Sequence, residues 1–196
     1  MPCARHDRPE APEHDQLIPS ADIVDIPRAG GLPRALLDLN NAFAQELSFL
    51  TPEKAAHLVA MARVAARIGD ADALLLAFDQ DAAYDNPNFA WFKARYPRFV
   101  YVDRIVVAPA ARGRGLAKAL YLDLFRRARG HERVVCEVNA DPPNPASDAF
   151  HAALGFEAVG GAQLLNTDRP ASGKPTSGKP TSGKRVRYFS RALALE

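Results

Sequence analysis

The stretch 105–117, IVVAPAARGRGLA, carries the residues best suited to bind a phosphate-bearing ligand. A run of β-branched residues leads into a turn of two Arg and two Gly, and the turn opens a helical pattern. The first N–H groups of a helix lack intrahelical partners and lie at the positive end of its dipole. Glycines without Cβ atoms let a ligand approach the backbone, and the arginines add charge. These features predict a cradle for a diphosphate. Its residues are Arg112, Gly113, Arg114, Gly115, Leu116 and Ala117.

This turn is neither of the two common nucleotide-binding loops. It lacks the Gly-Lys-Ser/Thr ending of a Walker loop, and Lys118 stands where the dinucleotide motif has its third Gly. An Arg- and Gly-rich turn can also be an ordinary solvated loop. Three further features decide against that reading: a Val-Val-Ala-Pro strand ending before the turn, a strand-like Cys-Glu-Val-Asn at 136–139, and a helical pattern at 144–156.

In this order, the features resemble the GNAT N-acetyltransferase superfamily. The Arg-x-x-Gly-x-Ala spacing at 112–117 resembles its acyl-CoA pyrophosphate loop, and 144–156 resembles its Asn-x-x-Ala-x-x-x-Tyr-x-x-x-Gly-Phe helix. Two departures occur: the connection before Asn144 is lengthened by Asp-Pro-Pro, and His151 replaces the usual Tyr. The resemblance implies an α/β fold, a mixed central sheet with splayed parallel strands, and acetyl-CoA as the cofactor.

In such a fold the neighbouring parallel strands, here 98–108 and 133–139, diverge from each other, and the pantetheine arm of the cofactor occupies the gap between them. The arm bonds the strand backbone much as an added strand would. A backbone N–H near residues 106–107 would polarise the thioester carbonyl and hold the oxyanion of a tetrahedral intermediate. The residues expected along the arm are Ile105, Val106, Val107, Asn144 and Ser147.

The acceptor amine needs a base, because an alkyl ammonium with a pKa of roughly 10 is protonated at pH 7. Glu137 and Asp103, both on the splayed strands, are the candidates. Glu137 can equally be a structural carboxylate, and Asp103 can be the salt-bridge partner of Arg104. His151 occupies the family's acid position and, with an ordinary pKa of about 6.5, suits proton transfer to the departing thiolate. A helix histidine that only packs on the cofactor is the alternative.

The segment 84–91 lies where the resemblance places the acceptor, and its polar and aromatic residues suit a small polar amine. A capped turn followed by a packed aromatic helix is the alternative reading. The expected acceptor contacts are Tyr84, Asn88 and Trp91, with no metal ligand.

The function expected is N-acetylation of a small primary amine by direct transfer from acetyl-CoA. A protein N-terminal or lysine acetyltransferase and a catalytically silent acyl-CoA-binding sensor are the alternatives. A homodimer is expected only by analogy with relatives.

Periodicity and turn residues predict the elements that position these groups. Strands are expected at 21–26, 71–79, 98–108, 133–139, 156–159, 162–165 and 184–193. Helices are expected at 32–49, 89–96, 115–129 and 146–154, and over a segment that Thr51 and Pro52 open and Gly69 and Asp70 end.

The length of 196 residues suits one domain, and the resemblance implies that this is a GNAT domain over residues 21–196. The net charge of +2 argues against a general nucleic-acid binder. The longest apolar run, 73–78, is too short to cross a membrane, and two cysteines without an expected disulfide suit a cytoplasmic protein. Residues 1–20 read as a disordered extension, and the Ser-Gly-Lys-Pro repeat at 171–184 reads as a low-complexity loop insertion.

Overall fold

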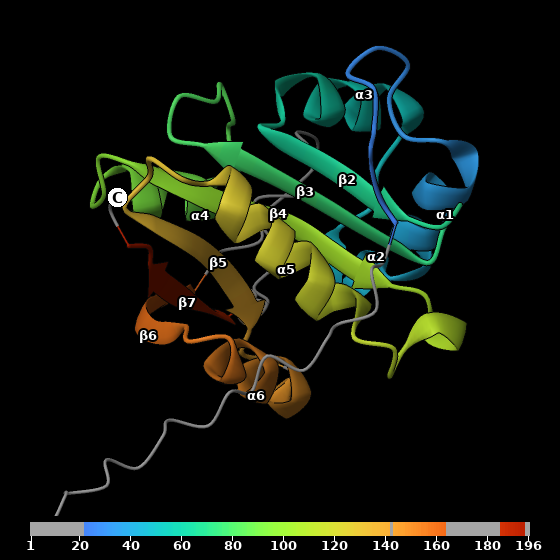
Figure 1. Ribbon diagram of the computed structural model, residues 1–196. Coiled ribbons are helices and arrows are strands. Elements are labelled where there is room, and N and C mark those ends of the chain that lie inside the picture. Colours follow the sequence, from blue (N-terminus) through green and yellow to red (C-terminus); the bar gives the residue numbers. More distant parts are fainter. Residues whose placement is uncertain (1–21, 142, 164–184, 195–196) are drawn as a thin grey trace, which may run out of the picture.

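The computed structural model describes residues 22–141, 143–163 and 185–194, so the predictions for 1–20 and 171–184 lie outside the described residues. Its strands form one sheet in the order β1-β2-β3-β4-β5-β7-β6, in which β4 and β5 are parallel and the other neighbours are antiparallel (Figure 1). The strands are β1 Ile23–Asp25, β2 Val64–Ile68, β3 Ala73–Asp79, β4 Phe99–Val107, β5 Arg133–Asn139, β6 Glu157–Gln163 and β7 Arg185–Ala192. The helices are α1 Arg34–Ala42, α2 Ala44–Leu47, α3 Pro52–Met61, α4 Pro87–Lys93, α5 Leu116–Arg127 and α6 Pro145–Ala153, with a 3-10 turn at Pro109–Ala111.

Helices cover both faces of this mixed sheet, as the predicted fold class requires. In β3 the alternate residues Leu74, Leu76 and Phe78 join a core with α1, α3 and α4, whereas Leu75 and Ala77 join a second core with α5. Figure 1 shows α5 crossing the face opposite to α4. Because β3 is buried on both faces, it reads as a continuous apolar run rather than an alternating one.

The parallel strands β4 and β5 pair over only part of their length. Their register runs from Phe99↔Arg133 to Val102↔Cys136, although β4 continues to Val107 and β5 to Asn139. On its other side β4 stays paired with β3 as far as Val107. The predicted splay therefore begins directly after Val102 and Cys136, and the next residues on the two strands are Asp103 and Glu137.

A β-bulge in β4 accompanies the splay. In the pairing with β3, Leu76 lies opposite Arg104 and Ala77 lies opposite Val102, so Asp103 is the extra residue. A bulge places two consecutive side chains on one face of a strand. Asp103 and Arg104 accordingly both point to the side that α1 and α4 cover, where they contact Tyr84 and Asn40.

The helix predicted to run from Thr51 to Gly69 is wrong in its second half. Thr51 caps α3 as expected, accepting from the Lys54 N–H, but α3 ends at Met61 and residues 64–68 form β2. The run of alanines there fits either a helix or a buried strand. Pairing of β2 with β3 over five residues decides for the strand, because long-range contacts outweigh a weak local propensity.

Two other boundaries also differ from the prediction. The helix expected over 32–49 is divided at Phe43 into α1 and α2. The Asn41 side chain exchanges two hydrogen bonds of 2.9 Å with the Leu50 backbone, which stabilises the turn that follows. The two short strands expected at 156–159 and 162–165 are one strand, β6, because β7 pairs along its whole length apart from one irregularity near Gly160.

Candidate active site

The turn between β4 and α5 has the backbone shape expected of a diphosphate cradle. Gly113 and Gly115 have φ angles of 77° and 73°, in the left-handed region that favours glycine, and Gly115 is the N-cap of α5. A Cβ placed on either glycine would meet no atom within 4 Å, so the space above both is open. The turn and the first turn of α5 thus fit the diphosphate of a CoA ester.

Both arginine side chains of this turn have protein partners. The Arg114 guanidinium lies 3.1 Å from Oδ2 of Asp72, and that of Arg112 lies over the Phe43 ring at 5.3 Å from its centre. The two side chains are exposed, so neither is locked in place. In the predicted cradle, the backbone of the turn would supply the fixed part, and the arginines would supply positive charge beside it.

A cavity of about 150 Å³ lies beside the splay on the α6 side of the sheet, and we call it the α6-side cavity. Cys136 and Tyr121 line this cavity, together with three residues predicted for the cofactor arm. Its lining is Glu46, Leu47, Val102, Asp103, Ile105, Tyr121, Cys136, Glu137, Val138, Asn139, Asn144, Ser147 and His151.

A second cavity, of about 170 Å³, lies on the α4 side and is called the α4-side cavity. It shares Glu46, Leu47, Asp103, Glu137 and Asn139 with the first. Each cavity is smaller than the roughly 300–1,000 Å³ of a typical ligand pocket, so each suits one end of a substrate. The remaining lining residues are Ser48, Lys54, Tyr84, Asn86, Pro87, Asn88, Arg104 and Val186.

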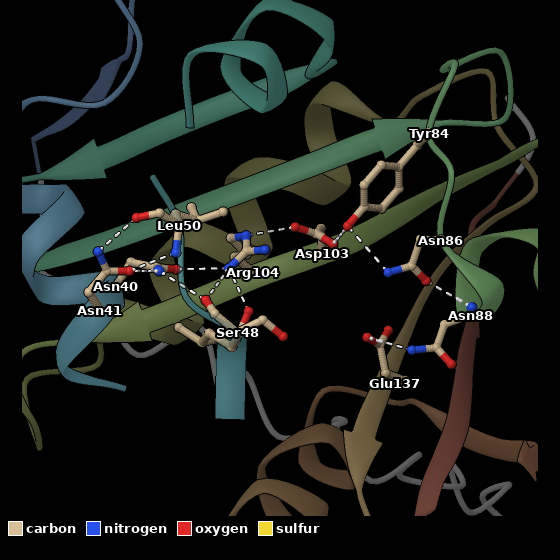
Figure 2. Close-up of polar contacts among 11 residues, drawn as sticks. Asn40, Asn41, Ser48, Leu50, Tyr84, Asn86, Asn88, Asp103, Arg104 and Glu137 are labelled. Carbon is tan, nitrogen blue, oxygen red and sulfur yellow. Dashed lines mark hydrogen bonds and ion pairs between the residues drawn. The ribbon is translucent and has the colours of Figure 1, made fainter. Parts of the chain in front are cut away.

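Glu137 is the carboxylate best placed at the junction of the two cavities. Its Oε1 accepts a hydrogen bond of 3.1 Å from Nδ2 of Asn88 (Figure 2). Burial raises the pKa of Glu137 to about 7, the nearby Asp103 charge adds to the rise, and the hydrogen bond from Asn88 opposes it. A carboxyl group with such a pKa is partly ionised near neutral pH and can accept a proton there.

Asp103 is held in a different way, within a buried polar network that Figure 2 shows. Its Oδ1 accepts from the Tyr84 hydroxyl at 2.6 Å, and its Oδ2 lies 2.8 Å from Nε of Arg104, with both side chains 4% exposed. Burial raises the pKa of Asp103, while Arg104 and Tyr84 oppose the shift. Arg104 also donates to Oδ1 of Asn40 and to the Leu47 carbonyl. The salt-bridge alternative for Asp103 is therefore what the structure shows.

The ring of His151 is enclosed between two protein partners. Its Nδ1 lies 2.7 Å from the Ser147 carbonyl oxygen, and its Nε2 lies 2.9 Å from the Tyr121 hydroxyl. A carbonyl can only accept, so Nδ1 carries the proton and Nε2 of the neutral ring accepts from Tyr121. Burial lowers the pKa of His151 and favours the neutral form.

The structure gathers most of the predicted site residues but not all. Tyr84 and Asn88 line the α4-side cavity, and Ile105, Asn144 and Ser147 line the α6-side cavity. Trp91 lines neither, because it packs on Tyr188 with ring centres 4.3 Å apart. Val106 is buried against the core on the α4 side and Val107 packs toward the α5 side, so their contribution to a cofactor arm is limited to the backbone.

The site residues that the sequence analysis missed include Glu46, Leu47 and Tyr121. Glu46 and Leu47 belong to α2, which is separated from α1 at Phe43, and no local pattern predicted this separation. Tyr121 occupies an inward position of the amphipathic helix α5, so it reads as a core residue until its neighbours are known.

Comparison with known proteins agrees with this geometry. Residues 36–156 match the family model described as Acetyltransferase (GNAT) family. A Nocardia farcinica protein named L-2,4-diaminobutyric acid acetyltransferase is 36% identical over 74 residues, which are 38% of this chain and only 37% of that protein.

Solved structures show the same fold at low sequence identity. The ribosomal-protein-alanine N-acetyltransferase from Brucella melitensis has a TM-score of 0.58 at 19% identity, over 87% of this chain and 99% of that one. The Salmonella typhimurium protein yncA, solved with its cofactor acetyl-CoA, has a TM-score of 0.56 at 16% identity, over 89% of this chain and 94% of that one. With a family model covering more than half of its residues, this chain belongs to the GNAT acetyltransferase family.

Proposed function

We propose that this chain is an N-acetyltransferase that transfers an acetyl group from acetyl-CoA to a small primary amine. The observation that carries the proposal is the junction of two cavities, one on each face of the sheet, where β4 and β5 separate. Glu137 lies at that junction and lines both cavities. Such a site lets two substrates enter from opposite faces and meet at one carboxylate.

The cofactor side of the proposal rests on the cradle at 112–117 and on the α6-side cavity. When bound, acetyl-CoA supplies an acetyl group activated as a thioester. The open backbone at Gly113 and Gly115 would hold its diphosphate, and the Asn144 and Ser147 side of α6 would border the arm. The edge of β4 beyond Val102, which has left β5, offers backbone groups to the arm.

The base in this proposal is Glu137, which would take a proton from the acceptor ammonium. A base works best when its pKa lies near the working pH, and the pKa of Glu137 is about 7. Asp103 is less suited, since Tyr84 and Arg104 already occupy its two oxygens. The role of Asp103 is instead to anchor the bulge that opens the junction.

A small and cationic acceptor is supported by the α4-side cavity. It is lined by the carboxylates of Glu46, Asp103 and Glu137, by the amides of Asn86, Asn88 and Asn139, and by Lys54 and Arg104, of which Arg104 is paired with Asp103. Its volume of about 170 Å³ suits a single amine-bearing side chain rather than a folded partner. The Nocardia farcinica relative is named for a small diamino acid, which agrees with this choice.

Thiol release from acetyl-CoA, followed with a panel of amines, tests the proposal. The panel should contain 2,4-diaminobutyrate, ornithine, a polyamine, and peptides with a free N-terminus or a single lysine. We expect release with one or more of the small amines and loss of that release in Glu137→Gln. Release with the peptides alone would move the assignment to a protein acetyltransferase. Binding of CoA in calorimetry, with no thiol release for any amine, would instead support a catalytically silent acyl-CoA-binding sensor.

A further inference from the structure

We propose that Asn88 and Tyr188 form a positioning relay that orients the Glu137 carboxylate for its role as base. The inference rests on the proposed function, since it takes Glu137 as the base. Nδ2 of Asn88 donates to Oε1 of Glu137 at 3.1 Å, and the Tyr188 hydroxyl donates to Oδ1 of Asn88 at 2.9 Å. Asn88 is 5% exposed and Tyr188 is 1% exposed, so water does not compete well for these bonds.

The direction of the relay follows from the chemistry of the amide. An asparagine side chain has an acceptor end and a donor end, which can exchange places by rotation. Because the Tyr188 hydroxyl donates to Oδ1, the NH₂ end faces the carboxylate and can only donate to it. Without the Tyr188 hydroxyl, the Asn88 amide could rotate and turn its oxygen toward Glu137. That oxygen would repel the ionised Glu137 carboxylate.

Three elements far apart in the sequence bring the relay together. Glu137 on β5 and Tyr188 on β7 are direct cross-strand partners, so their side chains share one face of the sheet. Asn88 reaches that face from the first turn of α4, where its backbone N–H donates to Oδ1 of Asn86 at 2.8 Å. Asn86 thereby caps the N-terminus of α4, and the backbone that carries the Asn88 amide is fixed.

The ring of Tyr188 is held from the other side by Trp91. Their ring centres are 4.3 Å apart, and the Trp91 ring occupies the space above Gly160, where a Cβ would lie 2.8 Å from it. This packing gives Trp91 a structural function beside the relay. The relay thus starts from a well-packed aromatic pair and ends at the carboxylate.

The relay opposes the effect of burial on Glu137. Burial disfavours the ionised carboxylate, and donation from Asn88 favours it. A carboxylate that lost this bond would remain protonated to higher pH and would be a poorer proton acceptor at neutral pH. The other titratable or charged groups that face Glu137 or share its cavities are Tyr84, Tyr101, Tyr121, Cys136, His151, Glu46, Asp103, Lys54 and Arg104.

The test is Tyr188→Phe, which keeps the ring and removes the hydroxyl. The Glu137 carboxyl is titrated by carbon-detected NMR in protein labelled at the glutamate side chains, with Glu137→Gln to assign the signal. Tyr96→Phe is the matched control, because Tyr96 stacks on Phe92 away from the carboxylate. This readout needs neither substrate nor activity, so its result is separate from that of the proposed function.

We expect the Glu137 midpoint to rise by about half a pH unit or more in Tyr188→Phe and to stay unchanged in Tyr96→Phe. Thiol release, once an acceptor is known, should show the same upward shift in the acidic limb of kcat/KM. An unchanged Glu137 midpoint in folded Tyr188→Phe would overturn the relay. If Tyr188→Phe does not fold, Asn88→Ser removes the hydrogen bond from α4 to Glu137 instead. An unchanged Glu137 midpoint in that variant would likewise overturn the relay.

Discussion

The hydroxyl of Tyr121 lies 2.9 Å from Nε2 of His151, while the other ring nitrogen contacts the Ser147 carbonyl. The histidine that replaces the family's usual tyrosine therefore does not present a free nitrogen to the α6-side cavity. A tyrosine hydroxyl from α5 stands beside it and lines the same cavity. Any effect of His151 on the departing thiolate would pass through this pair.

His151→Phe should lower kcat by about tenfold or more and leave the Kd for acetyl-CoA within about twofold. Phenylalanine keeps the ring packing on Phe156 and Phe189 but removes the acceptor for Tyr121. Steady-state kinetics and calorimetry measure the two quantities. Unchanged kcat would show that His151 only packs, and Tyr121→Phe then reports whether the hydroxyl acts alone.

Glu137→Gln should reduce kcat/KM by about 10²–10⁴ and should remove a bend in its pH profile near pH 7. The base must be ionised, so wild-type activity rises as pH increases through the pKa of about 7. The pH dependence of thiol release is the measurement. Asp103→Asn is the comparison variant and should keep a bend at lower pH, since Glu137 remains but the charge of Asp103 that helps to raise its pKa is gone. A bend lost only in Asp103→Asn would reverse the assignment of the base.

Glu137→Gln should also stabilise the fold above neutral pH. The folded pKa of Glu137, about 7, exceeds the ordinary 4.5, so the folded state binds the proton more tightly than the unfolded one. Its contribution to stability therefore falls as pH rises from 4.5 to about 7 and stays low above. We expect Glu137→Gln to be more stable than wild type by about 2 kcal/mol at pH 8, with the gain vanishing near pH 4.5. Urea unfolding at both pH values checks this; equal stability at pH 8 would contradict it.

Gly115→Val should weaken CoA binding by tenfold or more while leaving the use of acetylpantetheine nearly unchanged. A β-branched residue is strained at a φ of 73°, and its side chain would enter the open space above the turn. Acetylpantetheine lacks the diphosphate and should not sense the change. Calorimetry with CoA and thiol release from both donors are the measurements, and Arg112→Ala should show a weaker form of the same pattern. Equal losses with both donors would contradict a diphosphate cradle.

Arg104→Met should destabilise the fold by about 3–5 kcal/mol, because it leaves the Asp103 carboxylate buried without its counter-ion. It also removes the bonds to Asn40 and to the Leu47 carbonyl. Combining it with Asp103→Asn should restore part of the loss, as a double-mutant cycle in urea would show. Arg34→Met, which breaks an exposed pair with Asp38, is the control and should have little effect. Additive losses at positions 103 and 104 would show that the two charges do not interact.

The elements and the cofactor turn were largely predictable because their signals are local. The β5 prediction matches the structure residue for residue, and β4 and α5 lie within the predicted ranges. A turn with glycine at left-handed φ before a helix depends on neighbouring residues alone. By contrast, β2 was mistaken for helix, since the alanines at 65 and 66 favour a strand only once β3 lies beside them.

Local patterns were enough to predict the fold class, the turn at 112–117 and the candidate carboxylates on β4 and β5. Which of these carboxylates has a free oxygen could not be predicted in this way, because that depends on partners distant in the chain. Arg104 is next to Asp103 in sequence, yet the bulge had to turn both side chains to one face before they could pair. Glu137 meets Asn88 from α4 and lies across from Tyr188 on β7, 49 and 51 residues away. Such contacts arise from packing of the whole sheet, which no short stretch of sequence encodes.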